Sequence, residues 1–224
     1  MRYLFASALL ALCVQVSAAA DLPGTLAQMD KASAGFESMA ANVEWISYTA
    51  LVDDTSSETG TMVVRRDDKG VELKVDFTQP YERQLLIKGT KVESYKPRIN
   101  TVEEYDISKH KEKLEQALLL GFGVSGKYLS DNYEVKVLGE EESDGEQTVR
   151  LELIPKSADM KRSVPKLEMW VSTRTWQPVR QKLYQSSQGD FRIYAYSKIQ
   201  VNPSLKSSDF KLKTSGKVNR IRPQ

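Results

Sequence analysis

The stretch Val71-Glu72-Leu73-Lys74-Val75-Asp76-Phe77-Thr78 decides the fold, because apolar and polar side chains alternate along it without interruption. Successive side chains of a strand point to opposite faces of a sheet, so this period of two predicts a strand with one apolar and one solvated face. Sheets with one solvated face are usually antiparallel. The stretch therefore predicts an antiparallel sheet whose apolar face must be covered.

Similar runs lie on both sides of this stretch and are separated by short turns. Asp67-Asp68-Lys69-Gly70, Lys88-Gly89-Thr90 and Ser143-Asp144-Gly145 suit hairpins and are too short for the crossovers that parallel strands need. The further predicted strands are 45–52, 61–66, 83–88, 133–138, 148–154, 166–171, 179–184 and 191–197. Together they predict an antiparallel meander of nine or more strands.

Two segments have helical periodicity instead. In residues 24–39 the apolar side chains recur at steps of three and four, which predicts one amphipathic helix: Leu26, Met29, Ala32, Phe36 and Met39. Residues 108–122 begin polar and end in a Leu-rich stripe, and the glycine-rich residues 121–126 are interpreted as a flexible exit from this second helix. The two helices are expected to cover the apolar face of the sheet.

The N-terminus has the pattern of a secretory signal. Met1-Arg2 precede an apolar run over residues 3–16, and small residues at Ala18 and Ala20 suit cleavage after residue 20. Cys13 offers an alternative, a lipidation signal, but Leu12 directly before it fits that processing poorly. We therefore expect a signal peptide over residues 1–20, one domain over residues 21–224 and a periplasmic location. The mature chain would then contain no cysteine.

The composition offers little catalytic chemistry. The formal net charge is only +2, so a nucleic-acid partner is not expected. The one histidine, His110, lies among charged residues where a solvated side chain is the usual outcome. No phosphate-binding loop, nucleophile elbow or metal-ligand spacing occurs. We therefore expect no catalytic residues, no metal and no cofactor, with a paired-carboxylate hydrolase as the enzymatic alternative.

Several short motifs follow one another in a recognisable order. Gly60-Thr61 leads into a strand that ends in Arg65-Arg66; then come Thr78-Gln79-Pro80, an apolar strand ending at Gly89, and Tyr95-Lys96-Pro97. Later landmarks are Leu151 to Lys156 and the closing Asp209-Phe210-Lys211-Leu212 before a basic tail. In order and spacing the chain resembles the LolA-like family of periplasmic outer-membrane lipoprotein carriers over nearly its whole mature length.

The resemblance implies an α+β fold: a strongly curved, unclosed antiparallel half-barrel with helices covering its concave apolar face. It also implies a monomeric carrier that binds acyl chains of lipoproteins and moves them from an inner-membrane donor complex to an outer-membrane acceptor. The alternative is a module of the same fold that binds another amphiphilic lipid or glycolipid, or that senses envelope lipoproteins.

The resemblance also implies a role for one arginine. In the family a strand arginine hydrogen-bonds to the lid and holds the empty carrier closed, and Arg66 occupies the matching position here. The chain departs from the family pattern at Asp67, where proline is common, and at Val63 and Val75, where tryptophan is frequent. These departures leave the cargo and the partner proteins open.

The expected ligand-lining residues come from the apolar positions of the sheet and of the second helix. Each of them could equally be an ordinary core residue. They are Trp45, Met62, Val64, Phe77, Leu85, Ile87, Tyr95, Leu118, Phe122, Leu153, Met169 and Phe191.

Overall fold

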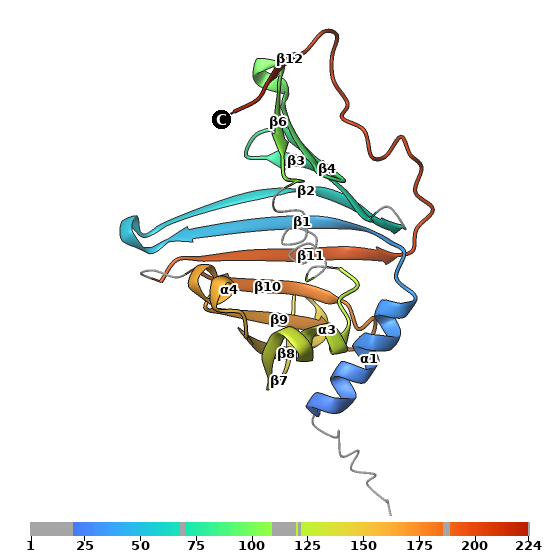
Figure 1. Ribbon diagram of the computed structural model, residues 1–224, viewed down its shortest axis with the longest axis vertical. Coiled ribbons are helices and arrows are strands. Elements are labelled where there is room, and N and C mark those ends of the chain that lie inside the picture. Colours follow the sequence, from blue (N-terminus) through green and yellow to red (C-terminus); the bar gives the residue numbers. More distant parts are fainter. Residues whose placement is uncertain (1–19, 68–69, 109–119, 121, 186–188, 224) are drawn as a thin grey trace, which may run out of the picture.

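The computed structural model describes residues 20–67, 70–108, 120, 122–185 and 189–223, which form one curved sheet with helices on one side (Figure 1). Twelve strands lie in the order β12-β6-β5-β4-β3-β2-β1-β11-β10-β9-β8-β7. Their bounds are β1 Ser38–Thr49, β2 Asp54–Asp67, β3 Gly70–Gln79, β4 Arg83–Lys88, β5 Lys91–Lys96, β6 Thr101–Asp106, β7 Tyr133–Ser143, β8 Glu146–Pro155, β9 Lys166–Ser172, β10 Pro178–Tyr184, β11 Phe191–Val201 and β12 Asn219–Ile221.

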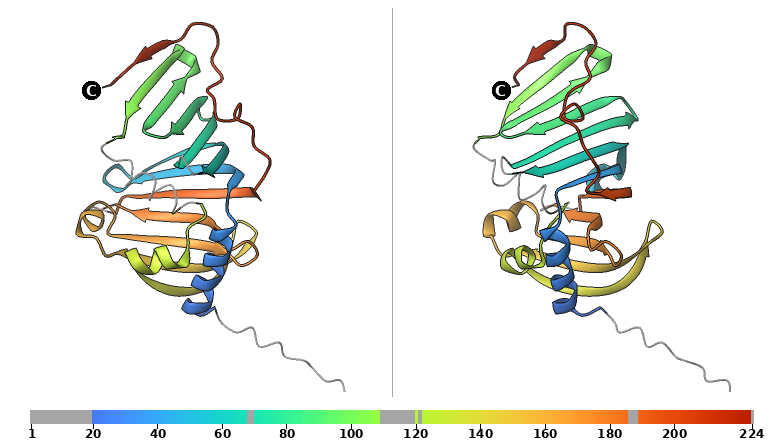
Figure 2. Two further views of the ribbon diagram at one scale, coloured as in Figure 1. Left: turned by 45° about the vertical axis from the view of Figure 1, so that its right-hand side comes forward. Right: turned by 90° about the vertical axis from the view of Figure 1, so that its right-hand side faces the viewer.

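The sheet is open, because its two end strands β12 and β7 do not pair with each other. Figure 2 shows the strong twist of the sheet, with β7 and β8 curving beneath the helices. The expected α+β half-barrel is thus confirmed. At its centre β1 pairs with β11, which follows it by some hundred and fifty residues, as in the pair Val43 and Tyr196. Two pairings differ from the expected meander: β1 with β11, which are not consecutive in the chain, and β12 with β6, which run parallel.

Helix α1, Leu22–Ala34, begins at Asp21, whose carboxylate accepts a hydrogen bond from the N–H of Gly24 at 2.7 Å. It is shorter than the expected helix over residues 24–39. The backbone leaves the helix at Gly35, and Met39 pairs with Val64 as part of β1. Met39 is apolar in either arrangement, so its periodicity alone extended the helix too far.

Two short helices were not expected from the sequence. Helix α3, Gly126–Asn132, is capped by the Ser125 hydroxyl, which accepts from the N–H of Tyr128 at 3.0 Å. Helix α4, Ala158–Ser163, is capped in the same way by Ser157. The end of the glycine-rich segment is therefore the start of a helix rather than a flexible exit. Most of the expected second helix, residues 109–119 and 121, lies outside the described residues.

Cross-strand pairing defines the two faces of the sheet. Met39 pairs with Val64, Met62 with Val75, and Leu73 with Ile87, so these side chains share one face. We call it the inner face, because α1 and α3 cover its other half. The opposite surface is the outer face.

The inner face carries two apolar clusters. The first cluster spans β1 to β4 and includes Phe36, Met39, Val43, Met62, Val64, Leu73, Val75, Phe77, Ile87, Phe122 and Tyr196. The second cluster spans β7 to β9 and includes Met29, Leu120, Val124, Leu129, Tyr133, Val149, Leu151, Leu153, Leu167, Met169 and Val171. Helices α1 and α3 cover the second cluster through Met29 and Leu129.

The outer face is covered in part by residues 203–218, which we call the C-terminal strap. It runs from the end of β11 to β12 along one side of the molecule (Figure 1). Phe210 is its buried anchor, and the Arg65 guanidinium lies 4.7 Å from the centre of that ring. Lys213 and the Gln84 amide exchange two hydrogen bonds, of 2.7 and 3.0 Å. The strap therefore completes the core on the outer side of β2 to β4.

Candidate functional site

The candidate site is the partly covered edge of the first cluster on the inner face. Trp45, Leu85, Val92 and Tyr194 are only half-buried there, although they pack against the buried residues of the cluster. The Trp45 ring packs edge to face against Phe77, with ring centres 4.8 Å apart, and against Tyr194, with ring centres 5.3 Å apart. These contacts form an aromatic edge of the first cluster.

Trp45 also brings a hydrogen-bond donor, its indole N–H, to this edge. Its indole Nε1 is buried and has no hydrogen-bond partner among the described residues. A buried donor without a partner is costly, so such groups call for a reason. An N–H at the edge of an apolar face could donate to the ester or amide oxygen of an amphiphile whose chain lies against that face.

Arg66 ties α1 to the sheet. Its side chain projects from β2 toward the inner face, and Nη2 donates to the carbonyl oxygens of Ser33 and Phe36, both at 2.8 Å. The guanidinium also lies 5.5 Å from the centre of the Phe36 ring. The carbonyls near a helix C-terminus lack partners within the helix and carry partial negative charge, so a cation suits this position.

Buried hydrogen bonds hold Leu120 and Gly123 against the inner face. The Gln181 amide donates to the carbonyl of Leu120 at 2.7 Å, and the Gln177 amide oxygen accepts from the N–H of Gly123 at 2.9 Å. The Ser33 hydroxyl donates to the carbonyl of Gly123 at 2.6 Å. Gly123 has a positive φ of 64°, and a Cβ there would lie 2.5 Å from the Phe36 ring. These contacts fix the positions of Leu120 and Gly123 on the inner face.

The burial of these two glutamines could not be predicted from the sequence. Gln177 follows Trp176 in a turn, and Gln181 sits among charged neighbours in β10, where an exposed side chain is the ordinary expectation. Both are buried. Only the positions of Leu120 and Gly123 beside these glutamines reveal their role.

Most of the residues expected to line a ligand site lie together on the inner face. Met62, Val64, Phe77, Ile87 and Phe122 are buried in the first cluster, and Trp45 and Leu85 pack against it half-buried. Leu153 and Met169 also lie on the inner face, but they are fully buried in the second cluster under the helices. Leu118 and His110 lie outside the described residues.

Two expected residues lie on the outer face instead. Tyr95 pairs with Gln84 and Val102, whose side chains point away from the first cluster, and its hydroxyl donates to the Asn100 amide oxygen at 3.0 Å. Phe191 pairs with Tyr48, and their rings stack at 4.9 Å. Both rings are therefore separated by the sheet from the other expected residues.

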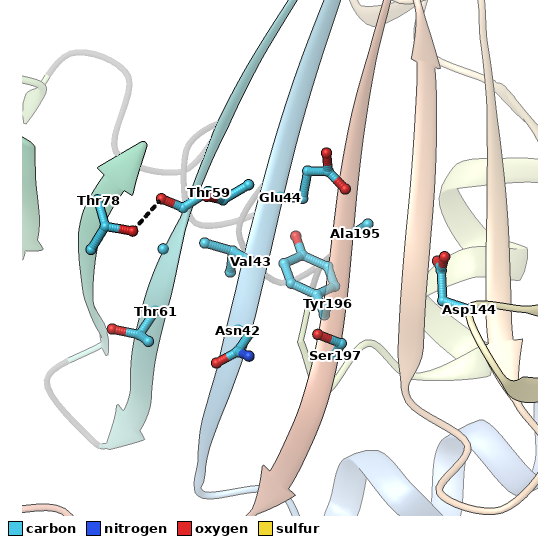
Figure 3. Close-up of a pocket in the computed structure, with 11 residues that line it drawn as sticks. Asn42, Val43, Glu44, Thr59, Thr61, Thr78, Asp144, Ala195, Tyr196 and Ser197 are labelled. Atoms are coloured by element: carbon cyan, nitrogen blue, oxygen red, sulfur yellow. Dashed lines mark hydrogen bonds between the residues drawn. The ribbon is translucent and has the colours of Figure 1, made fainter. Parts of the chain in front are cut away.

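One hollow lies on the outer face (Figure 3). It has a volume of about 680 Å³ and crosses β2, β1 and β11. Its lining is mixed, and its polar members are Asn42, Glu44, Thr59, Thr61, Thr78, Asp144 and Ser197. The sheet separates this hollow from the candidate site, so the two are distinct.

Ionisable groups lie on both faces of the sheet, and at the candidate site Arg83 pairs with Glu58 at 2.8 Å while its guanidinium lies 4.2 Å from the centre of the Phe77 ring. Burial alone would raise the pKa of Glu168, but hydrogen bonds from Arg150, Lys166 and Tyr184 outweigh it and hold that pKa below its ordinary value. On the inner face, burial raises the pKa of Tyr196, so the phenol stays neutral. Within the described residues, no group of three or more His, Cys, Asp or Glu side chains could hold a metal ion.

The inner face is a mainly apolar surface. Comparisons with known proteins concern the fold that carries this surface. A family model described as that of an uncharacterized protein matches residues 94–205, half of the 224 residues. The chain belongs to this family. Comparison with curated proteins gives no match. Among the described residues, no helix is both long and apolar enough to cross a membrane.

Solved structures show the fold more directly. MucB has a TM-score of 0.57 at 10% identity, over 88% of this chain and 65% of MucB, so the chain spans less than two thirds of that protein. The Mycobacterium tuberculosis lipoprotein LppX has a TM-score of 0.52 at 15% identity, over 82% of this chain and 98% of LppX. A LolA superfamily protein from Nitrosomonas europaea is also similar, with a TM-score of 0.40 at 15% identity over 85% of this chain and 97% of that one. The half-barrel expected from the sequence is thus a fold that the chain shares with MucB and LppX.

Proposed function

We propose that the chain is a periplasmic carrier that binds the acyl chains of lipoproteins against its inner face and moves them from the inner to the outer membrane. The observation that carries the proposal is the half-buried aromatic and aliphatic edge of the first cluster, at Trp45, Leu85, Val92 and Tyr194. Apolar side chains that a core leaves partly uncovered can contact an apolar ligand without being unpacked.

The energetics of transfer require such a surface. Each CH₂ group moved from a bilayer into water costs about 0.8 kcal/mol, so several acyl chains cost tens of kcal/mol unless a protein surface replaces the membrane. Release requires that this surface bind the chains loosely. The flexible side chains of Met39 and Met62 suit this requirement, because methionine adapts its shape to different neighbours.

The proposal gives Arg66 the role of a latch. In the empty carrier it holds the C-terminal end of α1 against β2 through the carbonyls of Ser33 and Phe36. Phe36 belongs to the first cluster. Release of Arg66 would therefore free the end of the helix that lies next to the candidate site and enlarge the space for cargo.

The proposal includes the remaining expectations from the sequence. Residues 1–20 would be removed as a signal peptide, and residues 21–224 would act as a single monomeric domain in the periplasm. Its partners would be acylated lipoproteins, an inner-membrane donor complex and an outer-membrane acceptor. The chain's own residues supply no catalytic step in this scheme.

Native mass spectrometry tests the proposal directly. The purified protein is mixed with a detergent-solubilised triacylated lipoprotein, and a stoichiometric complex is expected after the detergent is removed. Leu85→Asp, on the inner face, should abolish the complex, because it places a charge among the acyl chains. Ile46→Asp is the matched control, since Ile46 is also half-buried but pairs with Ile193 on the outer face.

The outcomes separate the proposal from its alternative. A complex that survives Leu85→Asp as well as Ile46→Asp would contradict binding at the inner face. A free lipid or glycolipid that co-purifies in place of lipoprotein would favour a binding module of the same fold with another ligand. A stable complex that never passes its lipoprotein to acceptor vesicles would favour a sensor.

A further inference from the structure

Three successive hairpins present large apolar side chains at their tips. Leu51 is 80% exposed and Val52 67% in the β1–β2 turn, Tyr81 is 70% exposed in the β3–β4 turn, and Ile99 is 61% exposed in the β5–β6 turn. The other large apolar side chains found exposed among the described residues reach at most 41%. The four most exposed of these apolar side chains therefore all lie at hairpin tips. We call Leu51, Val52, Tyr81 and Ile99 the tip row.

The tip row follows one rim of the sheet. Strands β1 to β6 are neighbours in chain order and antiparallel, so the three turns after β1, β3 and β5 must lie at the same ends of the strands. With neighbouring strands about 4.8 Å apart, the three tips span roughly 20 Å along this rim. The β1–β2 hairpin projects furthest, because β2 pairs with β1 from Asp54 but with β3 only from Thr59 (Figure 1).

The tips are held in shape by specific contacts. Asp53, with a φ of 48°, closes the first turn and accepts a hydrogen bond from the Tyr48 hydroxyl at 2.9 Å. The N–H of Ala50 donates to Asp190 at 2.8 Å. In the third turn Asn100, with a φ of 46°, accepts from the Tyr95 hydroxyl and donates to the carbonyl of Lys217 at 3.0 Å. The exposure of Leu51, Val52 and Ile99 is thus built into ordered turns.

The charges beside the tips differ along the row. Arg98 adjoins Ile99, and the C-terminal strap brings the exposed Lys213 and Lys217 to the same rim through Gln84 and Asn100. Acidic residues adjoin the other two tips: Asp53 and Asp54 beside Leu51 and Val52, and Glu82 beside Tyr81. The basic end of the row therefore favours anionic headgroups, while the first two tips depend on their apolar side chains.

We propose that the tip row docks the protein on the surface of a lipid bilayer. Single apolar side chains on separate turns, with charged residues between them, suit insertion into a fluid interface better than contact with one rigid protein surface. A tyrosine such as Tyr81 fits the headgroup level of a membrane, and the basic side chains near Ile99 meet anionic lipid. Docking by this rim brings the candidate site close to the bilayer, since Phe77 lies next to the β3–β4 turn.

This inference goes beyond the proposed function, because docking requires neither cargo nor an open latch. It is tested by flotation of the purified protein with vesicles of phosphatidylethanolamine and phosphatidylglycerol. The variant Leu51→Ser/Val52→Ser/Tyr81→Ser/Ile99→Ser should bind these vesicles at least about tenfold more weakly than the unaltered chain. The control variant Leu138→Ser/Val201→Ser, which changes side chains of 41% and 39% exposure within strands, should bind normally.

The result that overturns the inference is an unaltered protein that stays at the bottom of the gradient, or a tip-row variant that floats as well as the control. Circular dichroism of each variant checks that the fold is kept. The lipoprotein complex is measured on the same variants by native mass spectrometry. A tip-row variant that loses vesicle binding but keeps the lipoprotein complex separates docking from cargo binding.

Discussion

Replacement of Arg66 by leucine isolates the contact between α1 and the sheet. The change removes two hydrogen bonds of 2.8 Å from a guanidinium to the carbonyls of Ser33 and Phe36. A hydrogen bond to a charged group contributes about 1.5–3 kcal/mol, and water replaces part of it when a half-buried contact opens. We therefore expect the attachment of α1 to weaken by about 2–3 kcal/mol, which raises its open population about 30- to 150-fold.

Hydrogen exchange measured by mass spectrometry detects this change in peptides from Leu22–Ala34. Exchange there should accelerate by the same factor, while the strands of the second cluster keep their protection. Arg65→Leu is the matched control: it removes the neighbouring arginine, which pairs with Glu72 on the outer face at 2.5 Å. Unchanged exchange in the Arg66 variant, or equal acceleration in the Arg65 variant, would refute the latch.

Three further substitutions test other parts of the structure. Phe210→Ala removes the buried anchor of the C-terminal strap and should lower the free energy of unfolding by about 3–5 kcal/mol. Trypsin should then cleave the strap at doses that leave the unaltered protein intact. Gly60→Ala places a Cβ 2.1 Å from a backbone oxygen of β3 and should lower stability by about 2 kcal/mol or more in thermal melts, whereas Gly35→Ala, with nothing within 4 Å, should not. Glu168 has a lowered pKa, so its carboxylate stabilises the fold above the ordinary carboxyl pKa and this contribution is lost as the pH falls through the lowered value. Urea unfolding between about pH 7 and about pH 3 should therefore show a smaller loss of stability in Glu168→Gln than in the unaltered protein.

The alternation along residues 71–78 was sufficient to predict β3 and the character of the sheet around it. Strands β5 and β6 were missed because Lys91, Glu93 and Lys96 give that region no apolar period. These strands lie near the end of the sheet, where hydrogen bonds to β4 and to each other define them. Strand β12 was missed for a similar reason, since all three of its residues are exposed.

The assignment of residues to faces could be predicted only in part. A period of two shows which residues of one strand share a face, but it does not show which face is inner when both carry large side chains. In β11 Phe191 and Ile193 share one face, and Tyr194 and Tyr196 share the other. The pairing with β1 decides between them, and that register is not visible in the sequence of either strand.

The pairing of β1 with β11 at the centre of the sheet has a consequence for how the protein is made. A chain leaves the ribosome or a translocation channel from its N-terminus, so Ser38–Thr49 emerges long before Phe191–Val201. Until then one edge of β1 has no partner strand, and the two halves of the sheet cannot join. Contacts between residues so distant in sequence also slow folding. The finished half-barrel therefore cannot form until nearly the whole chain has emerged, which makes joining of the two halves of the sheet a late step of folding.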